Sequence, residues 1–491
     1  MKKARIISIA LAAFTALQLM LVPTMSVSAA SDAGVIINQD ASVIAKSITN
    51  AEGYKNFALS FEGSGVTDYI ISLNSVNAGL THVKTLCETF PTVGINAWLS
   101  FRMNDAQDSA VEVSSLLSTF INKNPGYKRV KTGTNANKYY NNCLDYTYDA
   151  VRDHMLGLIN TALSNYNCYG IELDFQREIW LWRVGGEYDG IAILNDFMRD
   201  VDRLTKVYAA KYGHDIKVSV RCASDLLTNY DFGLDLGTWA SEGIIDQVSP
   251  TGRFSTTDND IPVRLWTSFA KPYGITVAPC IEKNIVSGLD GKAGAQTFET
   301  ITAAAANFVS QGADKVYLYN YHIGPVTAFT AADKVASTAK TLDVTKGQGY
   351  WNVISTVGSY DKLMNLNRRM ILTYNDTHPL WAKSNAQLPL NIAKNTTKAI
   401  RIPVGDIPAG ATVTLKFSVN SVSSPAPTVY VNSEAATYTG TATCEGGFTT
   451  KTLLCYTVPA GAFDDTYIVA EIRSEAAVTI DYAEVYVKAA G

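Results

Sequence analysis

Eight short apolar segments recur between residues 35 and 321, and longer stretches with helical spacing separate most of them. The segments are Val35–Asn38, Tyr69–Leu73, Asn96–Phe101, Gly170–Phe175, Lys217–Cys222, Ile245–Pro250, Ile275–Ile281 and Val316–Tyr321. Each is rich in Val, Ile, Leu, Phe or Tyr, the composition of strands. Continuously apolar strands that alternate with helices are typical of a parallel sheet covered on both faces.

The intervening stretches have apolar residues at helical spacing. In Tyr148–Leu163, Val151, Met155, Leu158, Ile159 and Ala162 recur at three- and four-residue steps, which marks one face of a helix. Similar patterns cover Ile191–Tyr208, Gly237–Gly243, Ile261–Tyr273 and Thr297–Gln311. Eight such units predict an α/β fold, a (β/α)8 TIM barrel over residues 31–375, with an open doubly wound sheet as the main alternative. We favour the barrel because no G-x-G-x-x-G turn follows the first strand.

The pattern changes at about residue 376, where helical periodicity gives way to short alternating stretches. Turn sequences such as Pro408-Ala409-Gly410 separate them. The stretches are Thr397–Val404, Thr412–Val419, Thr428–Asn432, Thr452–Val458, Tyr467–Ile472 and Val478–Val487. Short strands at fairly regular spacing predict an antiparallel β-sandwich over residues 376–491, and Tyr374–Leu388 is the expected linker region.

The first 30 residues have the organisation of a secretory signal peptide. Lys2, Lys3 and Arg5 precede an apolar run that ends at Val22, and small residues follow at Val27–Ala30. A retained membrane anchor is the alternative, but the run contains polar residues and is marginal for spanning a bilayer. We expect export with cleavage near Ala29 or Ala30, and no membrane association afterwards.

Composition narrows the function further. The formal net charge is −4 and no basic stripe is present, which argues against nucleic acid as a partner. The five His residues form no H-E-x-x-H or H-x-H pattern, so we expect no metal and no cofactor. The seven Cys residues leave at least one without an intramolecular partner. Cys444 and Cys455 are close enough in sequence to bridge, whereas Cys222 and Cys280 are expected to be buried thiols.

Candidate chemistry gathers where the predicted strands end, because a TIM barrel carries its active site at the carboxyl ends of its strands. Polar residues at these positions are Asp40, Arg102, Asn104, Asp105, Glu172, Asp174, Arg177, Arg221, Glu282 and Asn320. Strand alternation places Glu172 and Asp174 on one face, while Ile171, Leu173 and Phe175 take the other. Two acids inside a barrel repel each other unless an Arg, a shared proton or a substrate compensates. A structural ion pair at the barrel mouth is the alternative interpretation.

Cleavage of a glycosidic bond needs two carboxyl groups, one to protonate the leaving oxygen and one to attack or to activate water. Asp174 after the fourth strand and Glu282 after the seventh are our first-choice pair, with Glu172 as a modulator of Asp174 and Asp40 and Asp105 in reserve. Glu282 follows an almost wholly apolar strand, although a solvated acid paired with Lys283 would give the same pattern.

Aromatic residues would form sugar-binding platforms, because they join a large apolar face to a polar edge. Trp180 and Trp182 follow the fourth strand in an expected loop, and Tyr319 ends the eighth; these three are predicted to bind substrate with Arg102, Asn104, Asp105, Asp40, Arg177, Arg221 and Asn320. Trp98 within the third strand is expected to be core. Three Arg residues at the rim hint at an anionic sugar.

Three stretches resemble a group of bacterial glycoside-hydrolase-like (β/α)8 proteins. These are Ser100-Phe101-Arg102-Met103-Asn104-Asp105, Leu144-Asp145-Tyr146, and Gly170-Ile171-Glu172-Leu173-Asp174-Phe175-Gln176-Arg177. In that group an S-F-R-M-N-D and a G-x-E-L-D-[FW]-x-R motif recur. The resemblance runs from about Val35 into the C-terminal domain and implies a glycosidase-like barrel with an appended β-sandwich. Retaining barrel glycosidases often place the acid/base after strand four and the nucleophile after strand seven, but Asp174 departs from their usual Asn-Glu pair.

The sequence therefore predicts a secreted glycoside hydrolase that acts on a polysaccharide or oligosaccharide, with Asp174 as general acid/base and Glu282 as nucleophile or base. Two alternatives stay open. A non-catalytic carbohydrate-binding or surface protein would use the same polar ring without cleaving, and a polysaccharide lyase or transferase would give different products.

Overall fold

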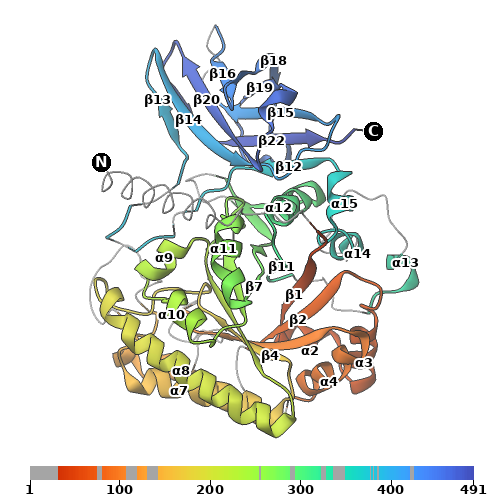
Figure 1. The fold of residues 1–491 in the computed structure, drawn as a ribbon, viewed down its shortest axis with the longest axis vertical. Helices are drawn as coiled ribbons and strands as arrows, with labels where there is room; N and C mark the ends of the chain where they lie inside the picture. The colour runs from red at the N-terminus through yellow and green to blue at the C-terminus, as the bar shows by residue number, and fades with distance from the viewer. Residues whose placement is uncertain are drawn as a thin grey trace, which may run out of the picture. The chain divides into compact units, whose positions relative to one another are not determined.

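The eight apolar segments form one parallel sheet in the computed structural model of the chain (Figure 1). The strands are β1 (Gly34–Asp40), β2 (Val66–Ser72), β3 (Asn96–Arg102), β4 (Gly170–Asp174), β5 (Lys217–Ala223), β6 (Gln247–Thr251), β7 (Thr276–Val277), β8 (Cys280–Ile281) and β11 (Lys315–Leu318). Their order is β7-β6-β5-β4-β3-β2-β1-β11-β8. The structure describes residues 31–73, 80–106, 119–129, 142–253, 256–287, 293–321, 328–334, 349–375, 377–379, 381–383, 386–420 and 425–490, which belong to one compact unit.

The sheet closes through an interrupted seventh strand. β7 pairs with β6 and β8 pairs with β11, and only Ala278 and Pro279 separate β7 from β8. Hydrogen bonds continue across the interruption, because the Ala278 amide donates to Val248 O at 2.9 Å and the Tyr317 amide donates to Pro279 O at 3.0 Å. The predicted barrel is therefore confirmed, and each predicted strand segment overlaps a strand of the sheet.

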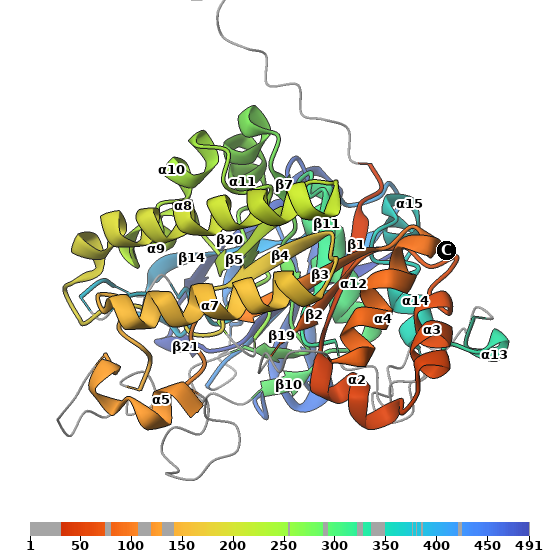
Figure 2. The same cartoon turned by 90° about the horizontal axis from the view of Figure 1, so that it is seen from below.

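Helices follow the strands, and most of them bury apolar residues against the outside of the barrel. They are α2 (Ala41–Ser47), α3 (Ala51–Leu59), α4 (Thr81–Thr89), α5 (Thr119–Lys123), α7 (Asp149–Asn165), α8 (Glu187–Tyr212), α9 (Leu226–Asp231), α10 (Leu236–Ser241), α11 (Val263–Ala270), α12 (Phe298–Ser310), α13 (Ala331–Lys334), α14 (Tyr350–Ile354) and α15 (Tyr360–Met364). In α7 the buried residues include Val151, Met155, Ile159 and Ala162, as the spacing predicts. Figures 1 and 2 show α7 and α8 side by side on the outside of the sheet.

Helix α12 differs from the others because nearly all of its residues are buried. It begins at a capping box in which Thr297 and Thr300 satisfy each other's backbone amides. One side packs on the barrel, and Ala303 packs into the core of the C-terminal strands. A helix that is apolar all round needs such cover on both sides.

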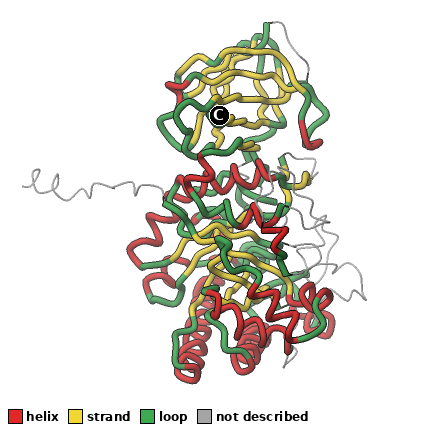
Figure 3. The backbone as a smooth tube through the Cα atoms, turned by 90° about the vertical axis from the view of Figure 1, so that its right-hand side faces the viewer, coloured by secondary structure: helices red, strands yellow, loops and turns green. Residues whose placement is uncertain are grey.

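The C-terminal residues form antiparallel strands, drawn in Figure 3 almost wholly as strand and loop. The strands are β12 (Arg368–Ile371), β13 (Leu390–Ile392), β14 (Thr396–Pro403), β15 (Thr412–Ser418), β16 (Thr428–Val431), β17 (Glu434–Ala435), β18 (Thr437–Ala442), β19 (Leu453–Val458), β20 (Tyr467–Ser474), β21 (Val478–Ile480) and β22 (Ala483–Lys488). A sheet ordered β12-β22-β15-β19-β18 and a sheet ordered β14-β20-β16-β17 share one apolar core. The predicted β-sandwich is confirmed, with β12 supplied by residues that precede the expected linker.

The segment after β12 is tied to loops at the carboxyl ends of the barrel strands. Asn259 Nδ2 donates to Ile371 O at 2.8 Å, and Asn375 Nδ2 donates to Asp258 Oδ2 at 2.6 Å. The Tyr374 amide donates to Val286 O at 2.8 Å. Val286 belongs to the hairpin of β9 (Asn284–Val286) and β10 (Ala293–Ala295), which begins two residues after Glu282. The residues at and after the end of β12 therefore contact the hairpin that follows the candidate acid Glu282.

All seven cysteines are free thiols in this structure. Cys222 and Cys280 are buried, as expected, whereas Cys444 and Cys455 are not bridged. Within the ranges that the structure describes, no helix is long and apolar enough to cross a membrane. The segment assigned to the signal peptide lies outside those ranges.

Gly170 tests the packing beneath the acids on β4. A Cβ at this position would lie 2.5 Å from two carbons of the Trp98 ring and 2.7 Å from Lys217 O. We expect Gly170→Ala to lower the stability by about 1–3 kcal/mol, because neither the ring nor the paired strand can move freely. Gly157→Ala in α7 is the control: its Cβ would meet nothing within 4 Å, and alanine is the better helix former. The midpoint of thermal unfolding should be highest for Gly157→Ala, intermediate for the wild type and lowest for Gly170→Ala. A Gly170→Ala midpoint at or above that of the wild type would contradict this packing.

Candidate functional site

Alternation along β4 sorts its side chains as the sequence predicts. Ile171, Leu173 and Phe175 pack in the core between sheet and helices, whereas Glu172 and Asp174 point into the barrel and are fully buried. The register places Asp174 beside Arg102 of β3 and Arg221 of β5. The barrel interior at this level is therefore lined by charges of both signs.

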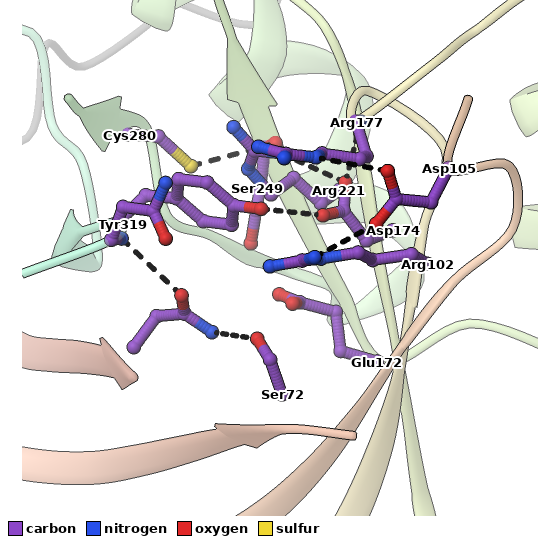
Figure 4. Close-up of polar contacts among 12 residues, drawn as sticks. Ser72, Arg102, Asp105, Glu172, Asp174, Arg177, Arg221, Ser249, Cys280 and Tyr319 are labelled. Carbon is purple, nitrogen blue, oxygen red and sulfur yellow. Dashed lines mark hydrogen bonds and ion pairs between the residues drawn. The ribbon is translucent and has the colours of Figure 1, made fainter. Parts of the chain in front are cut away.

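Arg221 joins the two first-choice acids. Its Nη1 donates to Asp174 Oδ1 at 2.8 Å and its Nη2 donates to Glu282 Oε1 at 3.2 Å. The guanidinium carbon lies 3.3 Å from the centroid of the Tyr319 ring. Arg221 is fully buried, so its charge has no water to screen it and is balanced by the two carboxylates (Figure 4 shows the Asp174 side of this bridge).

Asp174 accepts two further hydrogen bonds. The Arg177 amide donates to Oδ1 at 2.9 Å, and the Tyr319 hydroxyl donates to Oδ2 at 2.9 Å. Figure 4 shows Tyr319 and Arg221 both directed at this carboxylate. Three donors on one carboxylate stabilise its negative charge and fix its orientation.

Glu282 has a different environment. Its backbone is held by Thr257, whose Oγ accepts from the Glu282 amide at 2.9 Å and donates to its carbonyl at 3.0 Å. Among the residues described, its Oε2 has no hydrogen-bond partner. Burial raises the pKa of Glu282 to about 7, against the lowering effect of Arg221. This carboxyl group can therefore hold or release a proton near neutral pH.

Glu172 lies one level deeper in the barrel, between Ser100 and Ser219 in the strand register. Its Oε1 accepts a hydrogen bond from the Tyr317 hydroxyl at 3.0 Å. Burial, reinforced by the nearby charge of Asp174, raises the pKa of Glu172 to about 8. A protonated Glu172 places no second negative charge beneath Asp174, and its role as a modulator stays a prediction.

A second group of charges lies nearer the solvent. Arg102 donates to Asp40 and to Asp105, both at 2.8 Å, and Arg177 Nε lies 3.9 Å from Asp105 Oδ1. The Asp40 and Asp105 side chains keep 16% and 21% of their area exposed, whereas the inner acids have none. Of the five candidate acids of the site, Asp40 and Asp105 are thus the two that have direct access to solvent.

These pairings change the expectation of an anionic sugar. Arg102 lies between Asp40 and Asp105, and Arg221 lies between Asp174 and Glu282. Each of these positive charges is already matched by carboxylates of the chain itself. An anionic substrate would have to displace them, so the arrangement does not favour one.

Three predicted binding residues have other contacts in the structure. Asn104 exchanges hydrogen bonds with the Leu144 backbone and donates to Trp180 O, so its amide is occupied by loop backbone. Trp182 is 1% exposed, donates to Phe232 O and covers Gly190, where even a Cβ would be 2.3 Å from its ring. Trp180 is also buried, with its ring edge-on to Phe232. Both Trp residues therefore pack inside the protein rather than forming open platforms.

The remaining predicted residue, Asn320, follows β11 in the left-handed region with φ of 51°. The backbone amide of Asn320 donates a hydrogen bond to Asn38 Oδ1 at 3.2 Å. It is 5% exposed. This contact joins the ends of the first and eighth strands, and the residue's share in substrate binding stays a prediction.

Thr257 and Gln296 are site residues that the sequence reasoning missed. Gln296 Nε2 donates to Thr257 Oγ at 2.7 Å and to the Glu282 carbonyl at 3.2 Å. They come from loops after β6 and β10, and neither has a distinctive sequence neighbourhood. Only the fold brings them to Glu282. Within the described part of the chain, no group of three or more His, Cys, Asp and Glu is arranged to hold a metal ion.

Comparison with known proteins found similar structures but no similar sequence. No family model and no curated protein matches the sequence. The structure is similar to the glycoside hydrolase domain of PgaB (BpsB) from Bordetella bronchiseptica, with 8% identity, 67% of this chain and 99% of that chain covered, and a TM-score of 0.40. It is also similar to the endo-1,4-beta-mannanase of Rhizomucor miehei, with 10% identity, 68% of this chain and 94% of that chain covered, and a TM-score of 0.39.

A third neighbour is the GH36 alpha-galactosidase AgaA from Geobacillus stearothermophilus, at 12% identity and a TM-score of 0.35. The match covers 92% of this chain, which spans only 56% of the length of that enzyme. All three neighbours are glycoside hydrolases by name. TM-scores below 0.5 assign neither a family nor a reaction to this chain, so its chemistry must be argued from the site.

The raised pKa values of Glu172 and Glu282 predict how stability depends on pH. Both exceed the ordinary glutamate value of 4.5, so above that pH the folded protein keeps protons that the unfolded chain has released. Their contribution is fully present below pH 4.5 and is lost as pH rises through about 7 and about 8. Glu172→Gln cannot ionise, so we expect its thermal midpoint, relative to wild type, to rise between about pH 5 and the folded pKa of about 8 and to level off above it.

The surface substitution Glu88→Gln on α4 is the control, because this side chain is exposed. Its difference from wild type should stay flat over the same range. A Glu172→Gln difference that is equally flat would show that Glu172 does not retain its proton in the folded state.

Proposed function

We propose that the protein hydrolyses glycosidic bonds of an extracellular glycan with Asp174 and Glu282 as its carboxyl pair. One observation carries this proposal: two acids from β4 and the end of β8 meet at a single buried guanidinium, at the carboxyl ends of the barrel strands. Active sites of this fold lie at that end. Burying two carboxylates and an Arg together costs free energy that an apolar interior would avoid, which supports a chemical use.

The two environments support different roles. Glu282 has a pKa of about 7, and its Oε2 has no hydrogen-bond partner among the described residues. It is therefore suited to give its proton to the glycosidic oxygen as the bond to the anomeric carbon breaks. Asp174, held by three donors, is oriented to attack the anomeric carbon or to take a proton from water. This assignment exchanges the roles that strand position alone suggested.

Arg221 and Tyr319 position the pair. Arg221 fixes one oxygen of each acid, and Tyr319 fixes the second oxygen of Asp174. Arg102, Arg177, Asp40 and Asp105 surround this centre and are proposed to bind sugar hydroxyls. Because the Arg charges are matched internally, we propose a neutral glycan as substrate.

A second candidate is a carbohydrate-binding protein that does not cleave. The observation that favours it is the complete burial of Asp174 and Glu282 in an ion-paired bridge. The same bridge would then serve to hold β4, β5 and β8 together beneath a binding surface. Product analysis separates the two candidates directly.

The decisive experiment uses residues 31–491 and a panel of soluble polysaccharides, with products identified by mass spectrometry. We expect cleavage of a neutral glycan by the wild type, and a loss on the order of a thousandfold or more in Asp174→Asn and in Glu282→Gln, because each removes a group that acts on the reacting bond. Asp246→Asn is the control, since this acid lies at the opposite end of the barrel beside Lys217. Full activity in Asp174→Asn would refute the assignment.

The pH dependence of the same reaction separates the roles. If Glu282 must be protonated, kcat/KM falls as pH rises above about 7, the pKa of this carboxyl group. A fall only at acidic pH, with a plateau up to pH 9, would return Glu282 to the role of base. Wild type that binds glycans but releases no product would favour the second candidate.

Export is part of the proposal, and it rests on the charged start, apolar run and small residues before Ser31. We expect the full chain, produced in an exporting bacterial host, to reach the medium with a mature N-terminus near Ala30 or Ser31. N-terminal sequencing of the recovered protein checks this. Recovery in the membrane fraction with Met1 or Lys2 at the N-terminus would indicate a retained anchor instead.

A further inference from the structure

Three aromatic rings remain exposed near one side of the barrel. Tyr188 stands in the first turn of α8, Tyr230 lies in α9, and Trp381 belongs to the segment that follows the barrel. Their exposed fractions are 54%, 47% and 46%. Trp98, Trp182, Trp239 and Trp266, in contrast, are buried. Exposed aromatic rings were expected at Trp180 and Trp182, whereas in the structure Tyr188, Tyr230 and Trp381 are the exposed rings in this region.

The rings form one cluster, called here the Tyr188 cluster. The Tyr188 centroid lies 6.0 Å from that of Tyr230 and 5.6 Å from that of Trp381. The ring planes are tilted by 43° and 50°, so no ring covers the face of another. Large ring faces therefore stay in contact with solvent, which is unfavourable unless something binds them.

Hydrogen bonds at the ring edges hold two of the rings in place. The Tyr188 hydroxyl donates to Asp231 Oδ1 at 2.9 Å, and Trp381 Nε1 donates to Glu187 Oε2 at 3.2 Å. Each ring thus presents an apolar face with a carboxylate beside its polar edge. Preorganised rings lose little conformational entropy when a ligand stacks on them.

The Tyr188 cluster lies at the carboxyl ends of the barrel strands, where the candidate site also lies. A helix that follows a parallel strand starts where the strand ends, and α8 and α9 are the helices that follow β4 and β5. These are the strands of Asp174 and Arg221. Trp180, which packs on Phe232, connects the loop after β4 with the end of α9. The cluster is therefore on the side of the site reached from β4 and β5.

We infer that the Tyr188 cluster is a remote subsite that binds pyranose units of a neutral glycan chain, several sugars from the bond that is cut. An apolar ring face with hydrogen-bond acceptors at its edge matches a pyranose, which has apolar C–H faces and equatorial hydroxyls. Glu187 and Asp231 would repel a polyanion. The inference rests on the proposed function only in naming the cut bond; binding by the cluster is independent of it.

Binding is tested without turnover, by affinity electrophoresis of residues 31–491 in gels that contain mannan, xylan, beta-glucan, galactan or polygalacturonate. We expect at least one neutral polymer to retard the wild type. Tyr188→Ala and Trp381→Ala should each weaken that binding on the order of tenfold, the effect of removing a contact ring. Tyr273→Ala is the control, because this ring is 48% exposed but precedes β7 at the other end of the barrel.

The outcomes also separate this inference from the proposed function. Ring variants that bind as wild type, a wild type that no neutral polymer retards, or stronger retardation by polygalacturonate would each overturn the subsite. If hydrolysis occurs, the ring variants should raise KM for the polymer and leave kcat unchanged. Loss of binding in the ring variants with no hydrolysis by wild type would keep the subsite and refute the hydrolase.

Discussion

Arg221 is the group on which the arrangement of the barrel mouth depends. It is a fully buried cation that donates to carboxylates on two different strands and lies flat against Tyr319. A planar guanidinium is suited to this position because its donors diverge in one plane while its face stacks on an aromatic ring. Without it, Asp174 and Glu282 would lose the one cation that donates a hydrogen bond to both of them among the residues described. Four of the barrel strands are tied together through this single side chain and its partners.

The same bridge separates two acids that are chemically alike. Asp174 receives donors from a backbone amide, a hydroxyl and the guanidinium, whereas within the described part of the chain the Glu282 carboxyl group receives one guanidinium donor on one oxygen. Burial then dominates at Glu282 and raises its pKa to about 7. Carboxyl groups whose environments differ in this way can divide acid and base work at one pH. The difference between the two environments follows from the number of donors, which strand position does not reveal.

Much of the fold could be predicted from the sequence because the signal is local. Strand alternation correctly assigned Ile171, Leu173 and Phe175 to one face of β4 and Glu172 and Asp174 to the other. Each barrel strand overlaps one of the apolar runs in the sequence. The sequence could not show what each side chain contacts. Trp182 follows the acidic strand as a platform residue would, yet Gly190 of α8 leaves the space in which its ring is buried. Tyr188, Tyr230 and Trp381 come from three separate segments, so their cluster has no signature in any one of them. Short strands such as β17 and β12 were missed because two to four residues carry too little periodicity.

Strand β12 has a consequence for the order in which the protein can fold. It pairs with β22, the last strand of the chain, and Arg369 of β12 bonds Glu484 across 115 residues of sequence. Ile371, the last residue of β12, bonds Asn259, and the residues just after it bond Val286 and Asp258, around the hairpin that follows Glu282. This end of the barrel therefore gains its full support only after β22 has been synthesised. Contacts so distant in sequence form slowly, because the loop between them must close first. A growing or truncated chain would hold its barrel strands before the hairpin that follows Glu282 had gained these contacts.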